Sequence, residues 1–152
     1  MQPPPALAST AIPGMRISNY RNSAQRAIRL IGLGAAAGEL VDRIARRGRP
    51  NVATMTRNTS IGWPAMMGET PDRDPDMIVI VCREGDAHLF GPAAGRPDVL
   101  VTFVVLQREG RLLTAHDAGS APDLERARAF CDLFVTTSDA DFVSELIDNL
   151  AS

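Results

Sequence analysis

Three glycines with the spacing G-x-G-x-x-x-G, at Gly32, Gly34 and Gly38, follow the apolar run from Ala27 to Ile31. Glycine lets a main chain turn tightly, and the N-terminus of a following helix offers unpaired N–H groups to an anion. This pattern is typical of a site for the phosphates of a nucleotide. We therefore predict a phosphate-binding turn made of Gly32, Gly34, Ala35, Ala36, Ala37 and Gly38, with Ser138 and Asp139 facing the same crevice from a later strand end.

The same turn allows two other interpretations. Its glycine spacing is one residue longer than the commonest NAD(P) fingerprint, and the acid expected about 20 residues later is missing. Arg57 could instead meet the 2′-phosphate of NADP. A turn of this kind can also be structural and bind nothing.

No complete catalytic or metal-binding signature accompanies the turn. Cys82, Asp86 and His88 match no zinc spacing, and the chain has no Gly-x-Ser-x-Gly elbow around a nucleophile. All 16 basic residues are arginines. A Walker A motif and Schiff-base chemistry are thereby excluded, since both need a lysine. We predict no catalytic residue and no metal site.

Composition points to one folded domain. The chain has 152 residues, of which 45% are hydrophobic and 22% charged, as in ordinary globular proteins. Its apolar runs are too short to span a bilayer, and its N-terminus has no signal-peptide pattern. The two cysteines, Cys82 and Cys131, favour a reduced pair in a cytoplasmic protein. Arg43, Arg46, Arg47 and Arg49 form a basic cluster, but no aromatic platform or recognition helix accompanies it, so there is no clear nucleic-acid signal.

The elements that position the turn alternate between strands and helices. Residues 1–24 are predicted to be a flexible arm and 25–152 a single domain. Strands are expected at 27–32, 51–56, 77–82, 99–106, 111–115 and 133–137, and helices at 38–47, 121–134 and 140–150, with irregular segments at 57–75 and 83–97. The first helix should bury Leu40, Val41, Ile44 and Ala45. Near-continuous apolar strands separated by helices predict an α/β Rossmann-like three-layer sandwich with a mostly parallel sheet.

Segment 31–44 resembles the first phosphate loop and helix of FtsZ, the bacterial tubulin-like division GTPase. Three further segments resemble later elements of that family in the same order: 76–81, 102–111 and 132–139. The resemblance implies a Rossmann-like domain similar to the N-terminal half of FtsZ. It also implies GTP, GDP or another phosphate-bearing nucleotide as the ligand.

The chain departs from that family after Val81, where a Gly-rich signature loop should follow. Residues 82–88 lack consecutive glycines and contain Glu84 and Asp86, which would repel phosphate. The second domain of the family is absent from the sequence. We therefore expect no GTP hydrolysis and no filaments.

The sequence thus favours a degenerate nucleotide-binding domain that acts as a non-catalytic accessory or interaction protein. One alternative is a small NAD(P)-binding enzyme or sensor that uses the Gly32–Gly38 turn. Another is a domain without any ligand, which contacts a protein partner through residues 57–75 or the N-terminal arm. Self-association stays open.

Overall fold

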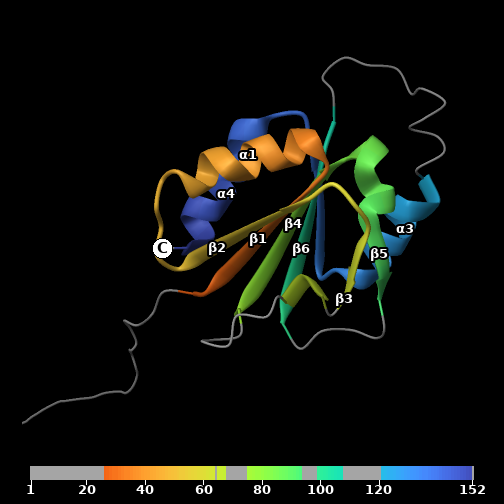
Figure 1. Ribbon diagram of the computed structural model, residues 1–152, viewed down its shortest axis with the longest axis horizontal. Helices are drawn as coiled ribbons and strands as arrows, with labels where there is room; N and C mark the ends of the chain where they lie inside the picture. The colour runs from red at the N-terminus through yellow and green to blue at the C-terminus, as the bar shows by residue number, and fades with distance from the viewer. Residues whose placement is uncertain (1–25, 64, 68–74, 94–98, 108–120, 152) are drawn as a thin grey trace, which may run out of the picture.

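A five-stranded parallel sheet forms the centre of the protein (Figure 1). The computed structural model describes residues 26–63, 65–67, 75–93, 99–107 and 121–151. The sheet has the order β2-β1-β4-β6-β7, and every neighbouring pair is parallel. Its strands are β1 (Ile28–Leu33), β2 (Val52–Arg57), β4 (Met77–Arg83), β6 (Leu100–Leu106) and β7 (Leu133–Thr137). The predicted α/β class and mostly parallel sheet are confirmed.

Burial follows the position of each strand in the sheet. All residues of β1 are buried, as are those of β4 from Met77 to Cys82. A strand with neighbours on both sides and layers on both faces is buried along its length, which favours apolar residues. The exception in these two runs is Arg29 of β1, a charged side chain that is only 7% exposed. The edge strands β2 and β7 are partly exposed along their whole length.

Two layers cover the sheet (Figure 1). Helices α1 (Ala35–Ala45) and α4 (Ala140–Ala151) lie on one face and share a core with Leu30, Val79 and Val104. Helix α3 (Ala121–Phe130) lies on the other face, with a small parallel sheet of β3 (Ile61–Trp63) and β5 (Phe90–Ala93). Because each face has its own layer, both sets of alternating side chains on the central strands are buried.

The first helix begins earlier than the sequence predicts. Helix α1 starts at Ala35, three residues before the predicted start at Gly38, and ends at Ala45. Its three alanines are strong helix formers, so the helix extends back to the glycine that breaks it. Leu40, Val41 and Ile44 are buried as predicted, but Ala45 is exposed, and that expectation was wrong.

Short elements in the two predicted irregular segments were missed. Segment 57–75 contains β3 and the 3-10 turn η1 (Ala65–Met67), and segment 83–97 contains the 3-10 helix η2 (Glu84–Leu89) and β5. Helix α3 also ends at Phe130 and not at residue 134. Strands this short are stabilised by partners distant in sequence, so no local period marks them. The predicted arm 1–24 and strand 111–115 lie outside the described residues. No helix in the described part of the chain is long and apolar enough to cross a membrane.

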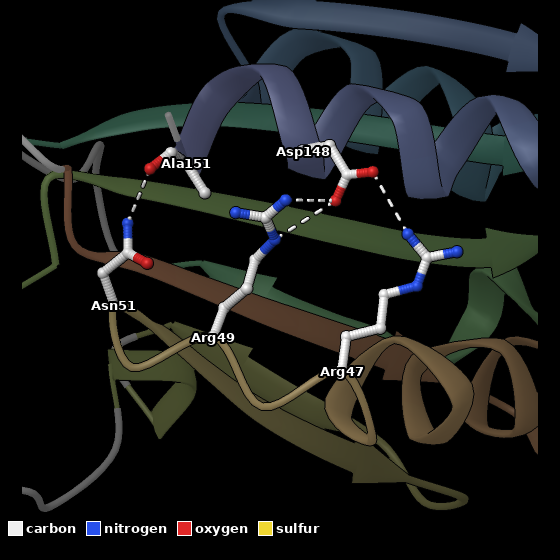
Figure 2. Close-up of polar contacts among 5 residues, drawn as sticks. All are labelled: Arg47, Arg49, Asn51, Asp148 and Ala151. Carbon is white, nitrogen blue, oxygen red and sulfur yellow. Dashed lines mark hydrogen bonds and ion pairs between the residues drawn. The ribbon is translucent and has the colours of Figure 1, made fainter.

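One carboxylate ties α4 to the loop that follows α1 (Figure 2). Arg49 donates to Asp148 Oδ1 from Nε at 3.1 Å and from Nη2 at 2.7 Å, and Arg47 Nη1 donates to Oδ2 at 3.1 Å. Nearby, Asn51 Nδ2 donates to the carbonyl of Ala151 at 3.0 Å. Two arginines of the predicted basic cluster therefore hold the C-terminal helix in place.

We expect Asp148→Asn to lower the free energy of unfolding by about 0.5–1 kcal/mol, because the ion pairs are partly exposed and screened by solvent. The loss should shrink at high salt. Urea unfolding at low and high ionic strength measures it, with Glu145→Gln, an exposed carboxylate on the same helix, as the matched control. Equal losses in the two variants would contradict the role given to Asp148.

Candidate functional site

The glycine turn lies at the carboxyl end of the sheet, between β1 and β4. From β1 the chain passes into α1, which packs on one face, and from β4 it passes into η2, whose Ala87 and Leu89 pack on the other. Adjacent strands whose connections leave to opposite faces form a topological switch point. In open α/β sheets this is where ligands bind. Of the residues predicted to form the turn, Gly34 lies between the two elements at this switch point, whereas Gly32 belongs to β1 and residues 35–38 belong to α1.

Gly34 makes the turn from β1 into α1. It has φ 91° and ψ 166°, a conformation that residues with a Cβ avoid. Its N–H donates to the carbonyl of Arg57 at 2.8 Å, which ties the turn to the end of β2. In the described part of the chain no side chain caps this end of α1 by a hydrogen bond, and Ala35 is exposed.

Gly32 and Gly38 differ in how strictly they must lack a side chain. A Cβ on Gly32 would lie 2.8 Å from Val41 Cγ2 and 2.9 Å from the carbonyl oxygen of Ala37, so Gly32 lets β1 and α1 pack closely. A Cβ on Gly38 would lie 3.7 Å from Thr56, an ordinary van der Waals contact. The first glycine is thus required by packing, whereas the last leaves room for a methyl group.

Asp86, from η2, lies directly against Gly34. A Cβ built on Gly34 would be 2.5 Å from Cγ of Asp86, and closer still to Oδ2. The carboxylate therefore fills the space where any other residue at position 34 would carry its side chain. This brings a negative charge to the residue that precedes the N-terminus of α1.

The charge of Asp86 has opposite effects on the helix and on an incoming phosphate. A carboxylate near a helix N-terminus is stabilised by roughly 0.3–1 kcal/mol. A second negative charge placed about 4 Å away at an effective dielectric near 20 costs about 4 kcal/mol. Repulsion outweighs the dipole, so a phosphate at Gly34 requires Asp86 to move or to lose its charge.

Ser138 and Asp139 lie at the same end of the sheet but farther along it. They follow β7, which is three positions from β1 in the strand order. At a strand spacing of about 4.8 Å this separates them from the glycine turn by roughly 14 Å. Asp139 Oδ1 accepts the N–H of Asp141 at 2.9 Å and thereby caps α4. Its carboxylate already has a structural role.

Cys82 ends the buried part of β4 just before η2. Burial and, to a lesser extent, the nearby charge of Asp86 raise the pKa of its thiol from 9.0 to about 12. A protonated thiol is neither a nucleophile nor a metal ligand at neutral pH. In the described part of the chain no three His, Cys, Asp or Glu side chains are grouped so as to hold a metal ion.

Arg57 is a cation at the end of β2, beside the turn. It pairs with Leu33 in the β1–β2 register, and its side chain is exposed. The sequence analysis named both Arg57 and Asp86, but it did not predict that the two residues flank Gly34. Adjacent parallel strands have their carboxyl ends at the same end of the sheet. If the sequence analysis had predicted that β4 lies beside β1, it would therefore have placed Asp86 next to Gly34.

Gly34→Ala should destabilise the fold strongly, because it combines an unfavourable φ with a clash against Asp86. We expect a loss of about 2–4 kcal/mol in urea unfolding. Gly38→Ala is the matched control and should be neutral or raise stability by up to about 1 kcal/mol. Similar behaviour of the two variants would contradict the assigned geometry.

The thiol of Cys82 should be inert in the folded protein. In a Cys131→Ser variant, which leaves one thiol, we expect negligible reaction with a disulfide reagent at pH 8 and full reaction in denaturant. Because the folded-state pKa is raised above the unfolded value, the stability contributed by the neutral thiol is present below pH 9. It is lost as the pH rises from about 9 to about 12. Rapid labelling of the native variant at pH 8 would contradict this description.

No known protein family, curated protein or solved structure matches this chain. The likeness of segment 31–44 to the FtsZ phosphate loop therefore stays a resemblance of short motifs in a shared order.

Proposed function

We propose that this chain is a non-catalytic domain of nucleotide-binding type whose phosphate position is filled by its own Asp86, and that it acts by binding protein. The contact between Asp86 and Gly34 carries this proposal. A negative charge held at the switch point opposes phosphate, and the buried, protonated Cys82 beside it supplies no nucleophile. The buried cysteines Cys82 and Cys131 form no disulfide with each other, which suits the reducing conditions of a cytoplasmic location.

Thermal unfolding with GTP, GDP, ATP, NADH and NADPH tests the proposal. A ligand at 100 times its dissociation constant adds roughly 2.7 kcal/mol, which raises the melting temperature by several degrees in a chain of this size. We expect no rise for the wild-type protein. A rise with any nucleotide in the wild type would overturn the proposed closure of the site.

Two substitutions of Asp86 separate its charge from its bulk. Asp86→Asn keeps the shape and removes the charge, whereas Asp86→Ala removes both. We expect a nucleotide-dependent rise in melting temperature for Asp86→Ala and a smaller one for Asp86→Asn, because the N-terminal amides of α1 become accessible to phosphate. The absence of any rise in both variants would mean that Asp86 is not what closes the site.

A second candidate function is binding of NAD(P) by a small enzyme or sensor in the same crevice. NAD(P) binding is favoured by Arg57, which is exposed and lies in register with Leu33 at the end of β1, where its guanidinium can meet a 2′-phosphate. This function requires a wild-type response to NADPH that exceeds the response to NADH and is lost in Arg57→Ala. A response to GTP alone would instead favour the purine nucleotide suggested by the FtsZ resemblance.

A further inference from the structure

Strand β7 is an edge of the main sheet with unused main-chain hydrogen-bonding groups. Gln107 N–H donates to the carbonyl of Thr137 at 2.8 Å, so the main-chain groups of Thr137 face β6. Successive residues of a strand present these groups to alternate sides, and Phe134 and Thr136 therefore direct theirs away from β6. In the described part of the chain no strand pairs with that outer side.

Helix α4 carries an apolar row on the side away from α1. Phe142, Leu146 and Leu150 follow the i, i+4, i+8 spacing of one helix stripe, and all three are only half buried. Val143 and Ile147 take the positions against the sheet, while Asp148 faces the arginines after α1. Leu146 and Leu150 pack in part against the core that α4 shares with α1, whereas Phe142 belongs to neither core of the described residues.

Two further apolar side chains, both leucines, lie at the amino ends of β6 and β7. Leu100 is 56% exposed and Leu133 is 51% exposed. Leu133 pairs with Thr102, two residues after Leu100, so both leucines point to the face that α4 covers. The ion pairs of Asp148 hold the end of α4 near the α1–β2 loop, which leaves this corner uncovered by the described residues.

The opposite face of β7 offers charges of both signs. The guanidinium of Arg128 on α3 lies 4.6 Å from the ring centroid of Phe134, and Glu125 lies one turn earlier on the same helix. Their mutual contact is loose, at 3.8 Å, and both side chains are largely exposed. The five residues of β7 carry no charge, and a charge on an edge strand is a usual protection against pairing.

From these observations we infer that β7 is the dimerisation edge of this domain and that its occupant is a second copy of the chain. Two antiparallel copies of β7, related by a twofold axis, satisfy the outer main-chain groups of Phe134 and Thr136. Full pairing of all five residues places Val135 at the axis and Leu133 opposite Thr137 of the other copy. The apolar rows of the two α4 helices then meet on one face.

Charge complementarity favours a second copy over an unrelated strand. The same twofold axis sets two antiparallel α3 helices side by side, so that Glu125 of each copy faces Arg128 of the other. An isologous interface needs a self-complementary patch of this kind. Dimerisation at β7 is independent of the proposed function of the glycine turn. The β7 edge lies at the far side of the main sheet from β2, and its side chains are not those of the turn.

Light scattering after size exclusion tests the inference on the full chain, from about 1 μM to about 1 mM. We expect a monomer–dimer equilibrium that Leu133→Lys weakens at least about tenfold. Thr54→Lys, on the other edge strand β2, is the matched control and should dimerise as the wild type does. Both positions are exposed, so both variants should fold, as circular dichroism would verify.

Hydrogen exchange locates the interface independently of any variant. The amide hydrogens of Phe134 and Thr136 should exchange more slowly as the protein concentration rises. A wild-type chain that stays monomeric to about 1 mM overturns the inference. A dimer that persists in the Leu133→Lys variant would also overturn it. A dimer in which the amides of Phe134 and Thr136 exchange as fast as in the monomer would do the same. A partner protein that protects the same amides of a monomeric chain would assign the edge to that partner instead.

Discussion

The backbone of Gly34 is the constraint on which the domain depends. Strand β1 turns into α1 at this residue with φ 91°, and its N–H is already used by the carbonyl of Arg57. Asp86 lies against the same residue from the opposite connection. Conformation and space therefore both require glycine here, and β1, β2, α1 and η2 meet at one residue without a side chain.

The contact at Gly34 links the stability of the fold to its use of the crevice. A carboxylate beside a helix N-terminus is stabilising, but the same carboxylate opposes the phosphate that a Rossmann-like switch point would otherwise hold. Neighbouring Cys82 is kept protonated by burial and by the charge of Asp86. Asp86 thus both lies against Gly34 and adds to the effect of burial on the pKa of Cys82.

A second constraint acts on the C-terminal helix. The ion pairs of Asp148 with Arg47 and Arg49 draw the end of α4 toward the loop after α1 (Figure 2). A helix held at that side cannot also cover the amino ends of β6 and β7. The exposure of Leu100 and Leu133 follows from this placement, although leucine itself favours burial.

Local patterns along the chain were enough to predict the α/β class, the parallel sheet and the buried strands β1, β4 and β6, because continuous apolar runs and helical periods are local signals. They also predicted a turn among Gly32, Gly34 and Gly38, because glycine lets the main chain turn tightly. The structure assigns that turn to Gly34, where φ is 91°. Contacts between distant segments place Asp86 against Gly34, pair β3 with β5, and put Ser138 and Asp139 three strands away from Gly34. Strand order and the packing of short connections depend on contacts between residues distant in the chain, which leave no local period to detect.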